Sequence, residues 1–157
     1  MSHNVSPLRE GFHNLTPCLV VKDANKAIEF YTKVFGAQEN YRNHAPDNKS
    51  IMYAELTIGD SKLVLSDEFP EMDSLSPPEI GKSPVSIYLY VDDADRTFEA
   101  AVSEGAEVIM QVTDAFWGDR WGQLRDPFGH IWSIATHNKD VTPEEMEKAA
   151  KEEYANK

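Results

Sequence analysis

The sequence repeats one order of elements twice, and this repeat constrains the fold more than any other feature. Residues 21–26, VKDANK, return 70 positions later as VDDADR at residues 91–96. In each copy an apolar, strand-like run precedes an Asp that can cap a helix, and a Gly follows the helix. Further strand-like segments come after the helix in both copies. We therefore predict a tandem β-α-β-β-β chain in which neither copy has to bury a core alone.

The repeat also sets the expected boundaries. We expect helices over 24–35 and 94–104, and strands over 15–21, 38–42, 51–58, 62–66, 85–91, 120–125 and 131–136. The predicted organisation is a polar arm (1–13), a single domain (14–137) made of two modules (14–69 and 84–137) with a Pro-rich linker (70–83), and a helical tail (138–157). The segment 67–84, which contains this linker, carries four prolines and many acids, so no regular element is expected there.

Composition excludes several classes of function. The chain has 157 residues and a net charge of −12, so nucleic acid and anionic membranes are not expected as partners, because phosphate binding needs a basic patch. No apolar run reaches the roughly 18 residues of a membrane span. The single Cys18 excludes an internal disulfide, and the opening segment lacks an apolar signal core. These features indicate a cytoplasmic protein.

The segment 116–137, FWGDRWGQLRDPFGHIWSIATH, predicts a hairpin with an unusual number of large aromatic residues. Its turn is Asp126-Pro127-Phe128-Gly129, where Pro fixes one corner and Gly can take a positive φ. The hairpin is either part of the core or the wall of an apolar cavity. In the second case Asp119, Arg120 and Arg125 lie at the rim; otherwise the arginines form surface ion pairs with Asp119 or Asp126.

The tandem order, the helix KAIEFYTKVFGA and the DPFGH hairpin resemble the vicinal oxygen chelate superfamily. That superfamily includes glyoxalase I, methylmalonyl-CoA epimerase, extradiol dioxygenases, fosfomycin-resistance enzymes and bleomycin-resistance proteins. The hairpin and the run ELTIGDSKLVLSDEFPEM are most similar to its PhnB-like branch. The resemblance implies an α+β fold in which two modules form a curled mixed-sheet cup, followed here by a C-terminal helix. It also implies a homodimer.

In that superfamily, enzymes hold a divalent metal through four His or Glu side chains on the cup floor. The resemblance carries these positions to Thr16, Leu65, Ser86 and Ser133. Hydroxyl and aliphatic groups do not supply the imidazole, thiolate or carboxylate donors of such a site. We therefore predict that the chain uses no metal and no other cofactor.

Two other chemistries remain open. A displaced metal site could use Glu55 with His137, and Glu55 is also the one candidate for a catalytic carboxylate. Cys18 shares a predicted strand face with Thr16 and could be a nucleophile, whereas a small buried cysteine is usually an inert core residue.

Strand alternation predicts the lining of the cup. The expected ligand-binding residues are Thr16, Cys18, Tyr53, Glu55, Leu65, Ser86, Tyr88, Trp117, Arg120, Trp121, Arg125 and Ser133. Aromatic and hydroxyl groups suit an organic molecule held by stacking and a few hydrogen bonds. An inward Glu55 needs a cation, from Arg120, Arg125 or the ligand; otherwise it is a solvated or Arg-paired strand residue.

Two functions from different classes fit these features. The first is a metal-free small-molecule-binding protein of the bleomycin-resistance kind, because the resemblance implies an acidic homodimer that sequesters cationic drugs. In it Trp117, Trp121 and Tyr88 stack on an aromatic cation. The alternative is a glyoxalase-like lyase, epimerase or dioxygenase that uses a divalent metal or a displaced catalytic site.

Overall fold

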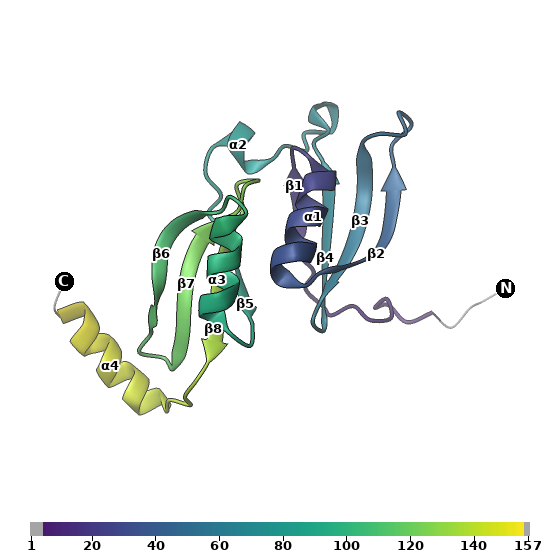
Figure 1. The fold of residues 1–157 in the computed structure, drawn as a ribbon. Coiled ribbons are helices and arrows are strands. Elements are labelled where there is room, and N and C mark those ends of the chain that lie inside the picture. Colours follow the sequence, from purple (N-terminus) through teal and green to yellow (C-terminus); the bar gives the residue numbers. More distant parts are fainter. Residues whose placement is uncertain (1–4, 156–157) are drawn as a thin grey trace. The chain divides into compact units, whose positions relative to one another are not determined.

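The computed structural model describes residues 5–155, which divide into an N-terminal unit up to Lys82 and a C-terminal unit from Ser83 (Figure 1). The N-terminal unit contains β1 (Cys18–Val21), α1 (Ala24–Phe35), β2 (Gln38–His44), β3 (Ile51–Ile58), β4 (Ser61–Asp67), the 3₁₀ helix η1 (Pro70–Met72) and α2 (Pro77–Ile80). The C-terminal unit contains β5 (Ser86–Tyr90), α3 (Ala94–Ser103), β6 (Glu107–Asp114), β7 (Asp119–Arg125), β8 (Ile131–His137) and α4 (Pro143–Ala155).

Both units have the same topology, which confirms the predicted tandem β-α-β-β-β fold. The strand order is β1-β4-β3-β2 in the N-terminal unit and β5-β8-β7-β6 in the C-terminal unit. The first strand of each unit pairs in parallel with the last, and the other pairs are antiparallel. Each unit therefore has an open, mixed sheet of four strands, and the helix that packs on the sheet is α1 in the N-terminal unit and α3 in the C-terminal unit.

The helix ends follow from the repeated capping residues. Asp23 accepts a hydrogen bond from the backbone N–H of Lys26 at 3.1 Å, and Asp93 accepts one from Arg96 at the same distance. Gly36 ends α1 in the left-handed region at φ 69°. Because the caps satisfy backbone groups that a helix end leaves unpaired, both helices begin where the sequence predicts.

One face of each sheet is covered by the helix of its own unit (Figure 1), and the core lies between them. The buried residues of the N-terminal unit include Leu19, Val21, Ala54, Leu56, Leu63 and Leu65 of the sheet with Ile28, Tyr31, Val34 and Phe35 of α1. Those of the C-terminal unit include Leu124, Trp132 and Ile134 of the sheet with Phe98 and Ala101 of α3. We call the other side of each sheet its open face.

Strand register corrects two predicted positions. Leu65 pairs with the buried Leu19 and is itself buried on the helix-covered face, so its expected place on the cup floor is wrong. Val64, which pairs with Cys18, takes the open-face position instead. The error is one residue, and a shift of one residue moves a strand side chain to the opposite face. Thr16 precedes β1, which begins at Cys18 rather than at residue 15.

The expectation of no regular element in 70–83 is also wrong. The short helices η1 and α2 lie there, each with a proline in its first turn. Proline is tolerated at that position because the first N–H groups of a helix have no intrahelical partner.

The turn between β7 and β8 is built around the buried side chain of Asp126. Its Oδ1 accepts hydrogen bonds from the backbone N–H groups of Phe128 at 2.9 Å and His130 at 3.0 Å. Its Oδ2 accepts one from the indole N–H of Trp132 at 2.8 Å. Gly129 takes a φ of 96°, as the turn signal predicts.

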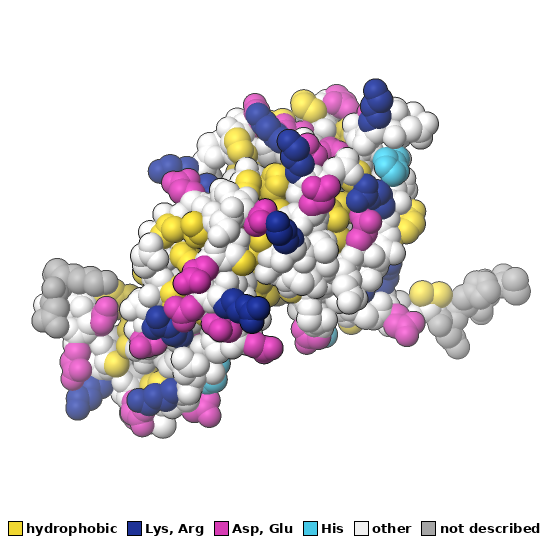
Figure 2. Space-filling view, in the orientation of Figure 1, with side chains coloured by type: hydrophobic (Ala, Val, Ile, Leu, Met, Phe, Trp, Pro, Cys, Tyr) yellow, Lys and Arg dark blue, Asp and Glu magenta, His cyan; other side chains and the backbone are white. Residues whose placement is uncertain are grey.

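Charged side chains are spread over the surface rather than gathered by sign: Lys and Arg lie among Asp and Glu on the face drawn in Figure 2. In α4 none of the described residues is buried. No helix within residues 5–155 is long and apolar enough to cross a membrane.

Candidate functional site

An aromatic cluster lies on the open face of the C-terminal sheet. It consists of Tyr88 and Tyr90 from β5, Phe116 and Trp117 from the loop before β7, and Trp121 from β7. Tyr88 stacks on Trp121 with ring centroids 6.2 Å apart and an interplanar angle of 19°. Trp117 lies 5.3 Å from Trp121, and Tyr90 lies 5.2 Å from Tyr88. The cluster is partly open to solvent, since Tyr88 keeps 41% of its surface exposed.

A small residue on the strand β8 allows the rings of β5 and β7 to come into contact. The strand β8 lies between β5 and β7, and its residue Ala135 pairs with Tyr90 on one side and Trp121 on the other. Because alanine carries only a methyl group, the larger rings of the two neighbouring strands extend over it. Ala135 is completely buried as a result.

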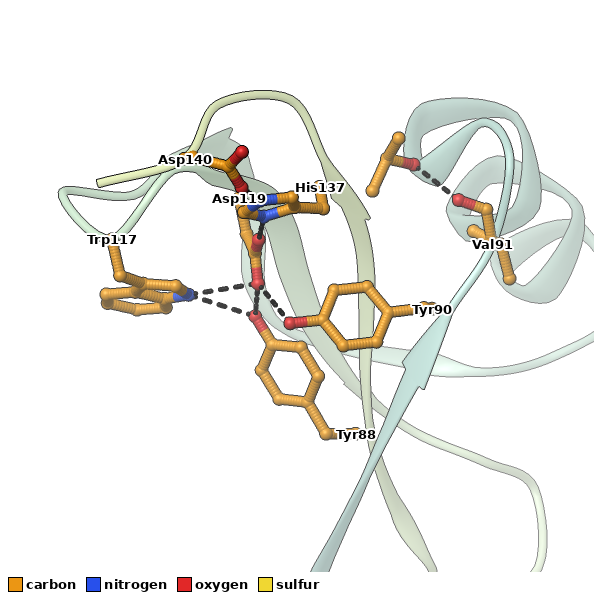
Figure 3. A network of polar contacts seen from close by, with 8 residues as sticks. Tyr88, Tyr90, Val91, Trp117, Asp119, His137 and Asp140 are labelled. Carbon is orange, nitrogen blue, oxygen red and sulfur yellow. Dashed lines mark hydrogen bonds and ion pairs between the residues drawn. The ribbon is translucent and has the colours of Figure 1, made fainter. Parts of the chain in front are cut away.

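Asp119 holds the polar groups of this cluster together (Figure 3). Its Oδ2 accepts hydrogen bonds from the hydroxyls of Tyr88 at 2.6 Å and Tyr90 at 2.9 Å, and from the indole N–H of Trp117 at 3.2 Å. Its Oδ1 lies 2.7 Å from Nδ1 of His137, the residue opposite it on β8. Asp119 is only 2% exposed, so its carboxylate depends on these four partners.

The electrostatics of the network keep Asp119 ionised. Burial by itself raises the pKa of this carboxyl, but the hydrogen bonds from Tyr88, His137, Tyr90 and Trp117 outweigh burial and leave the pKa below its ordinary value. Burial, and then the hydrogen bond to Asp119, raises the pKa of the Tyr88 phenol well above its ordinary value. Both tyrosines therefore stay neutral donors at physiological pH.

His137 connects the network to a second acid. Its Nε2 lies 2.7 Å from Oδ1 of Asp140, an exposed carboxylate. The contacts with Asp140 and then with Asp119 raise the pKa of the His137 imidazole above its ordinary value.

These shifts predict how the stability of the C-terminal unit depends on pH. The raised pKa of His137 gives stability that is present below the unfolded pKa of about 6.5 and is lost as pH rises through the folded pKa. The lowered pKa of Asp119 gives stability that is present above the unfolded pKa of about 3.9 and is lost as pH falls through the folded pKa. We expect urea unfolding, followed by tryptophan fluorescence, to show a maximum between about pH 4 and 6.5. The fall on the alkaline side should disappear in His137→Gln, and its persistence would contradict the assignment.

The predicted arginines do not both lie at this site. Arg120 pairs with Thr136 of β8 on the helix-covered side and binds Asp95 of α3 at 2.6 Å, so it does not point into the cluster. It also binds Asp114 at 3.2 Å. Arg125 lies on the open face but is paired with Glu107 of β6 at 3.0 Å.

The two predicted serines differ in their surroundings. Ser133 is buried on the open face, where its hydroxyl accepts a hydrogen bond from the side-chain amide of Gln123 at 3.2 Å. Ser86 lies at the start of β5 and is exposed.

The open face of the N-terminal unit centres on Glu55. Its Oε1 binds Nη2 of Arg9 at 3.1 Å and accepts a hydrogen bond from the Tyr53 hydroxyl at 3.3 Å, and its Oε2 lies 3.9 Å from Nζ of Lys62. The cationic partners of Glu55 are therefore Arg9 and Lys62, not the predicted Arg120 or Arg125. The exposed Cys18 lies on β1 of this sheet.

These side chains do not fit a divalent metal. The predicted floor positions carry the hydroxyls of Thr16, Ser86 and Ser133, and Val64 stands where Leu65 was expected. Neutral hydroxyl and aliphatic groups bind a divalent cation far more weakly than an imidazole, a carboxylate or a thiolate does. Within residues 5–155 no group of three or more His, Cys, Asp or Glu side chains is placed to hold an ion.

The sequence did not identify Asp119 and His137 as the residues that connect the polar groups of the aromatic cluster. The sequence predicts Asp119 at a rim, whereas its position two residues before Trp121 puts it on the same strand face as that ring. His137 continues the open face of β8 two residues after Ala135. Alternation could have identified both. For Arg9, in an arm without periodicity, the sequence offered no comparable signal.

Comparison with known proteins gives one family. Residues 11–134 match the Glyoxalase/Bleomycin resistance protein/Dioxygenase superfamily. The uncharacterized protein Mb0911c of Mycobacterium bovis is 40% identical over 152 residues, which cover 95% of this chain and 95% of that protein.

Solved structures agree with this match. Protein PA1353 from Pseudomonas aeruginosa has a TM-score of 0.66 at 27% identity and covers 81% of this chain and 99% of that chain. The PhnB protein from Bacillus cereus has a TM-score of 0.61 at 17% identity, covering 79% of this chain and 98% of that chain. At that identity the second likeness concerns the fold alone.

Proposed function

Because the chain belongs to the Glyoxalase/Bleomycin resistance protein/Dioxygenase superfamily, we propose that it is a metal-independent binding protein for a small organic molecule. The ligand lies on the open face of the C-terminal unit against Tyr88, Trp117 and Trp121. The observation that carries this proposal is the partly exposed, stacked aromatic cluster whose polar groups are fixed by one buried carboxylate.

The cluster is suited to binding because its rings are already held in place. The phenol of Tyr88 and the indole of Trp117 both bond Asp119, so little side-chain freedom is lost when a ligand arrives. Aromatic faces attract cations, and the ionised Asp119 behind them adds to that attraction. An aromatic cation is therefore the ligand class that we expect to bind most tightly.

Tryptophan fluorescence tests this proposal directly. Trp121→Ala should weaken the binding of an aromatic cation by about tenfold, because one stacked ring contributes roughly 0.5–1.5 kcal/mol beyond the area it covers. Quenching by a panel of cationic and neutral aromatic compounds gives the affinities. The control is Trp132→Phe, which alters an indole on the helix-covered face and should leave the affinity unchanged. A panel without any saturable quenching would contradict the proposal.

Metal independence has its own test. We expect no stabilisation when Ni²⁺, Zn²⁺ or Fe²⁺ is added in a thermal-shift assay, and no stoichiometric metal in elemental analysis of the purified protein. A bound ion that protects the fold would favour a glyoxalase-like lyase, epimerase or dioxygenase instead.

A displaced catalytic site is the second candidate, because Asp119 and His137 form an acid–imidazole pair with 2.7 Å between Oδ1 and Nδ1. A buried carboxylate in that position orients the imidazole, and Nε2 becomes available as a general base when the exposed carboxylate of Asp140 moves away from it. The test is deuterium exchange at the carbon beside the carbonyl of hydroxyketones in D₂O. Exchange that is lost in His137→Gln but unaffected by chelators would favour this candidate.

We further propose that the protein is a cytoplasmic homodimer that binds neither nucleic acid nor membranes. The net charge of −12 supports the exclusion of polyanionic partners. Light scattering coupled to size-exclusion chromatography measures the mass directly, and a monomer across the micromolar range would contradict the dimer.

A further inference from the structure

The N-terminal arm lies on the open face of its own sheet. Arg9 binds Glu55 through Nη2 and the Tyr53 hydroxyl through Nη1, at 3.1 and 3.2 Å. The guanidinium carbon of Arg9 also lies 4.4 Å from the ring centroid of Phe12. Further along the arm, His13 Nε2 lies 3.1 Å from the backbone carbonyl of Asp60. The contacts with β3 and with the β3–β4 turn thus come from arm side chains, since residues 5–13 contain no helix or strand.

The two partners of the central ion pair differ strongly in exposure. Glu55 is 7% exposed, whereas the side chain of Arg9 is 67% exposed. A carboxylate that is nearly buried needs a cation, but an exposed arginine gains little from such a pair, typically about 0–1 kcal/mol. Of the two cations near Glu55, Lys62 is the more buried and lies 3.9 Å from Oε2, whereas the exposed Arg9 binds Oε1 and is the partner that a ligand can replace.

We propose that this position is a binding site for a small guanidinium or ammonium compound, and that Arg9 of the arm is its built-in competitor. The floor of the site is the carboxylate of Glu55 with the rings of Tyr53 and Tyr41, whose centroids lie 6.1 Å apart. Tyr41 is the strand partner of Glu55 and so shares its face. This site lies on the N-terminal unit, whereas the proposed function concerns the C-terminal unit. The inference rests on the proposed function in one respect: both take the open face of a sheet as the surface that binds a ligand.

Geometry favours a free ligand over the tethered arginine. Arg9 divides its two terminal nitrogens between Glu55 and Tyr53, so the carboxylate receives one guanidinium contact within hydrogen-bond range. A free guanidinium can give both of its parallel N–H groups to the two carboxylate oxygens, which is the stronger arrangement. It can then take the place of the Arg9 guanidinium, which lies 4.4 Å from the Phe12 ring centroid.

The experiment uses the full chain and compares phenylguanidinium with phenylurea, its neutral analogue. Binding is followed through the backbone amide NMR signals of Tyr53 and Glu55. We expect Arg9→Gln to tighten phenylguanidinium binding by about tenfold, the gain when a competitor occupies the site for roughly nine-tenths of the time. Glu55→Gln should abolish this binding. Arg96→Gln, an exposed arginine of α3, is the matched control and should change nothing.

Release of the arm gives a second measurement. Cleavage after Glu10 by a glutamyl endopeptidase, read by mass spectrometry, should accelerate when phenylguanidinium is added and in Arg9→Gln. The proposal would be overturned if phenylguanidinium bound the wild type and Arg9→Gln with equal affinity. It would also be overturned if phenylurea changed the amide signals and the cleavage rate as much as phenylguanidinium does. All three tryptophans lie in the C-terminal unit, so fluorescence quenching reports the proposed function separately from these signals.

Discussion

Trp132→Ala is expected to destabilise the C-terminal unit by about 3–5 kcal/mol, the usual cost of removing a large buried aromatic side chain. Trp132 is 1% exposed and lies on the helix-covered face of β8. Its loss leaves a cavity in the core and also removes the indole donor from the buried Asp126. Urea unfolding followed through the fluorescence of Trp117 and Trp121 measures the change.

Two conservative variants separate the cavity from the hydrogen bond. Trp132→Phe keeps most of the ring volume but leaves Asp126 Oδ2 without the indole, so a loss of about 1–3 kcal/mol is expected. Asp126→Asn retains an oxygen for the N–H groups of Phe128 and His130 and should cost a similar amount. If Trp132→Ala costs no more than Trp132→Phe, packing of the Trp132 ring does not contribute to the stability of the core.

The fold could be predicted from the sequence because its determinants are local and occur twice. Asp23 and Asp93 cap helices through backbone groups three residues away, and Asp126 with Gly129 forms its turn within four residues. Such interactions depend on sequence spacing alone. The repeat then fixes strand order, since two copies with the same elements adopt the same topology.

Strand faces were harder to predict, because their period is only two residues. The resemblance gives Leu65 and Ser133 equivalent places in the two modules, whereas the pairing of Val64 with Cys18 corresponds to that of Ser133 with Tyr88. The one-residue difference moved Leu65 from the core to the predicted cup. Arg120 was misplaced for a related reason: it alternates with Asp119 and faces Asp95 of α3.

Long-range partners were beyond sequence reasoning altogether. Glu55 required a cation, which was correctly inferred, but nothing in the chain indicates that Arg9, 46 residues earlier, supplies it. In the same way Asp119 gathers donors from β5, β8 and the preceding loop, and only the sheet order brings these together. The sites are therefore properties of the topology more than of any motif.

Asp119→Ala is expected to be the most damaging change on the open face, both for stability and for ligand binding. Four donors lose their acceptor, from Tyr88, Tyr90, Trp117 and His137. Hydrogen bonds to a charged group are individually worth about 1.5–3 kcal/mol, but Tyr88 and Tyr90 are partly exposed and can turn their hydroxyls to water, so we expect a total loss of about 2–4 kcal/mol.

Two further variants test whether this loss comes from the network. Asp119→Asn should cost nearly as much, because all four partners donate and an amide offers one acceptor oxygen while directing N–H groups at the rest. Asp114→Ala, an exposed partner of Arg120, is the matched control and should stay within about 0.5 kcal/mol. Since Asp119 also fixes the rings of Tyr88 and Trp117, the affinity for an aromatic cation should fall in Asp119→Ala, as is expected for Trp121→Ala. An Asp119→Ala protein as stable as Asp114→Ala, with full affinity, would show that the rings hold their positions by packing alone.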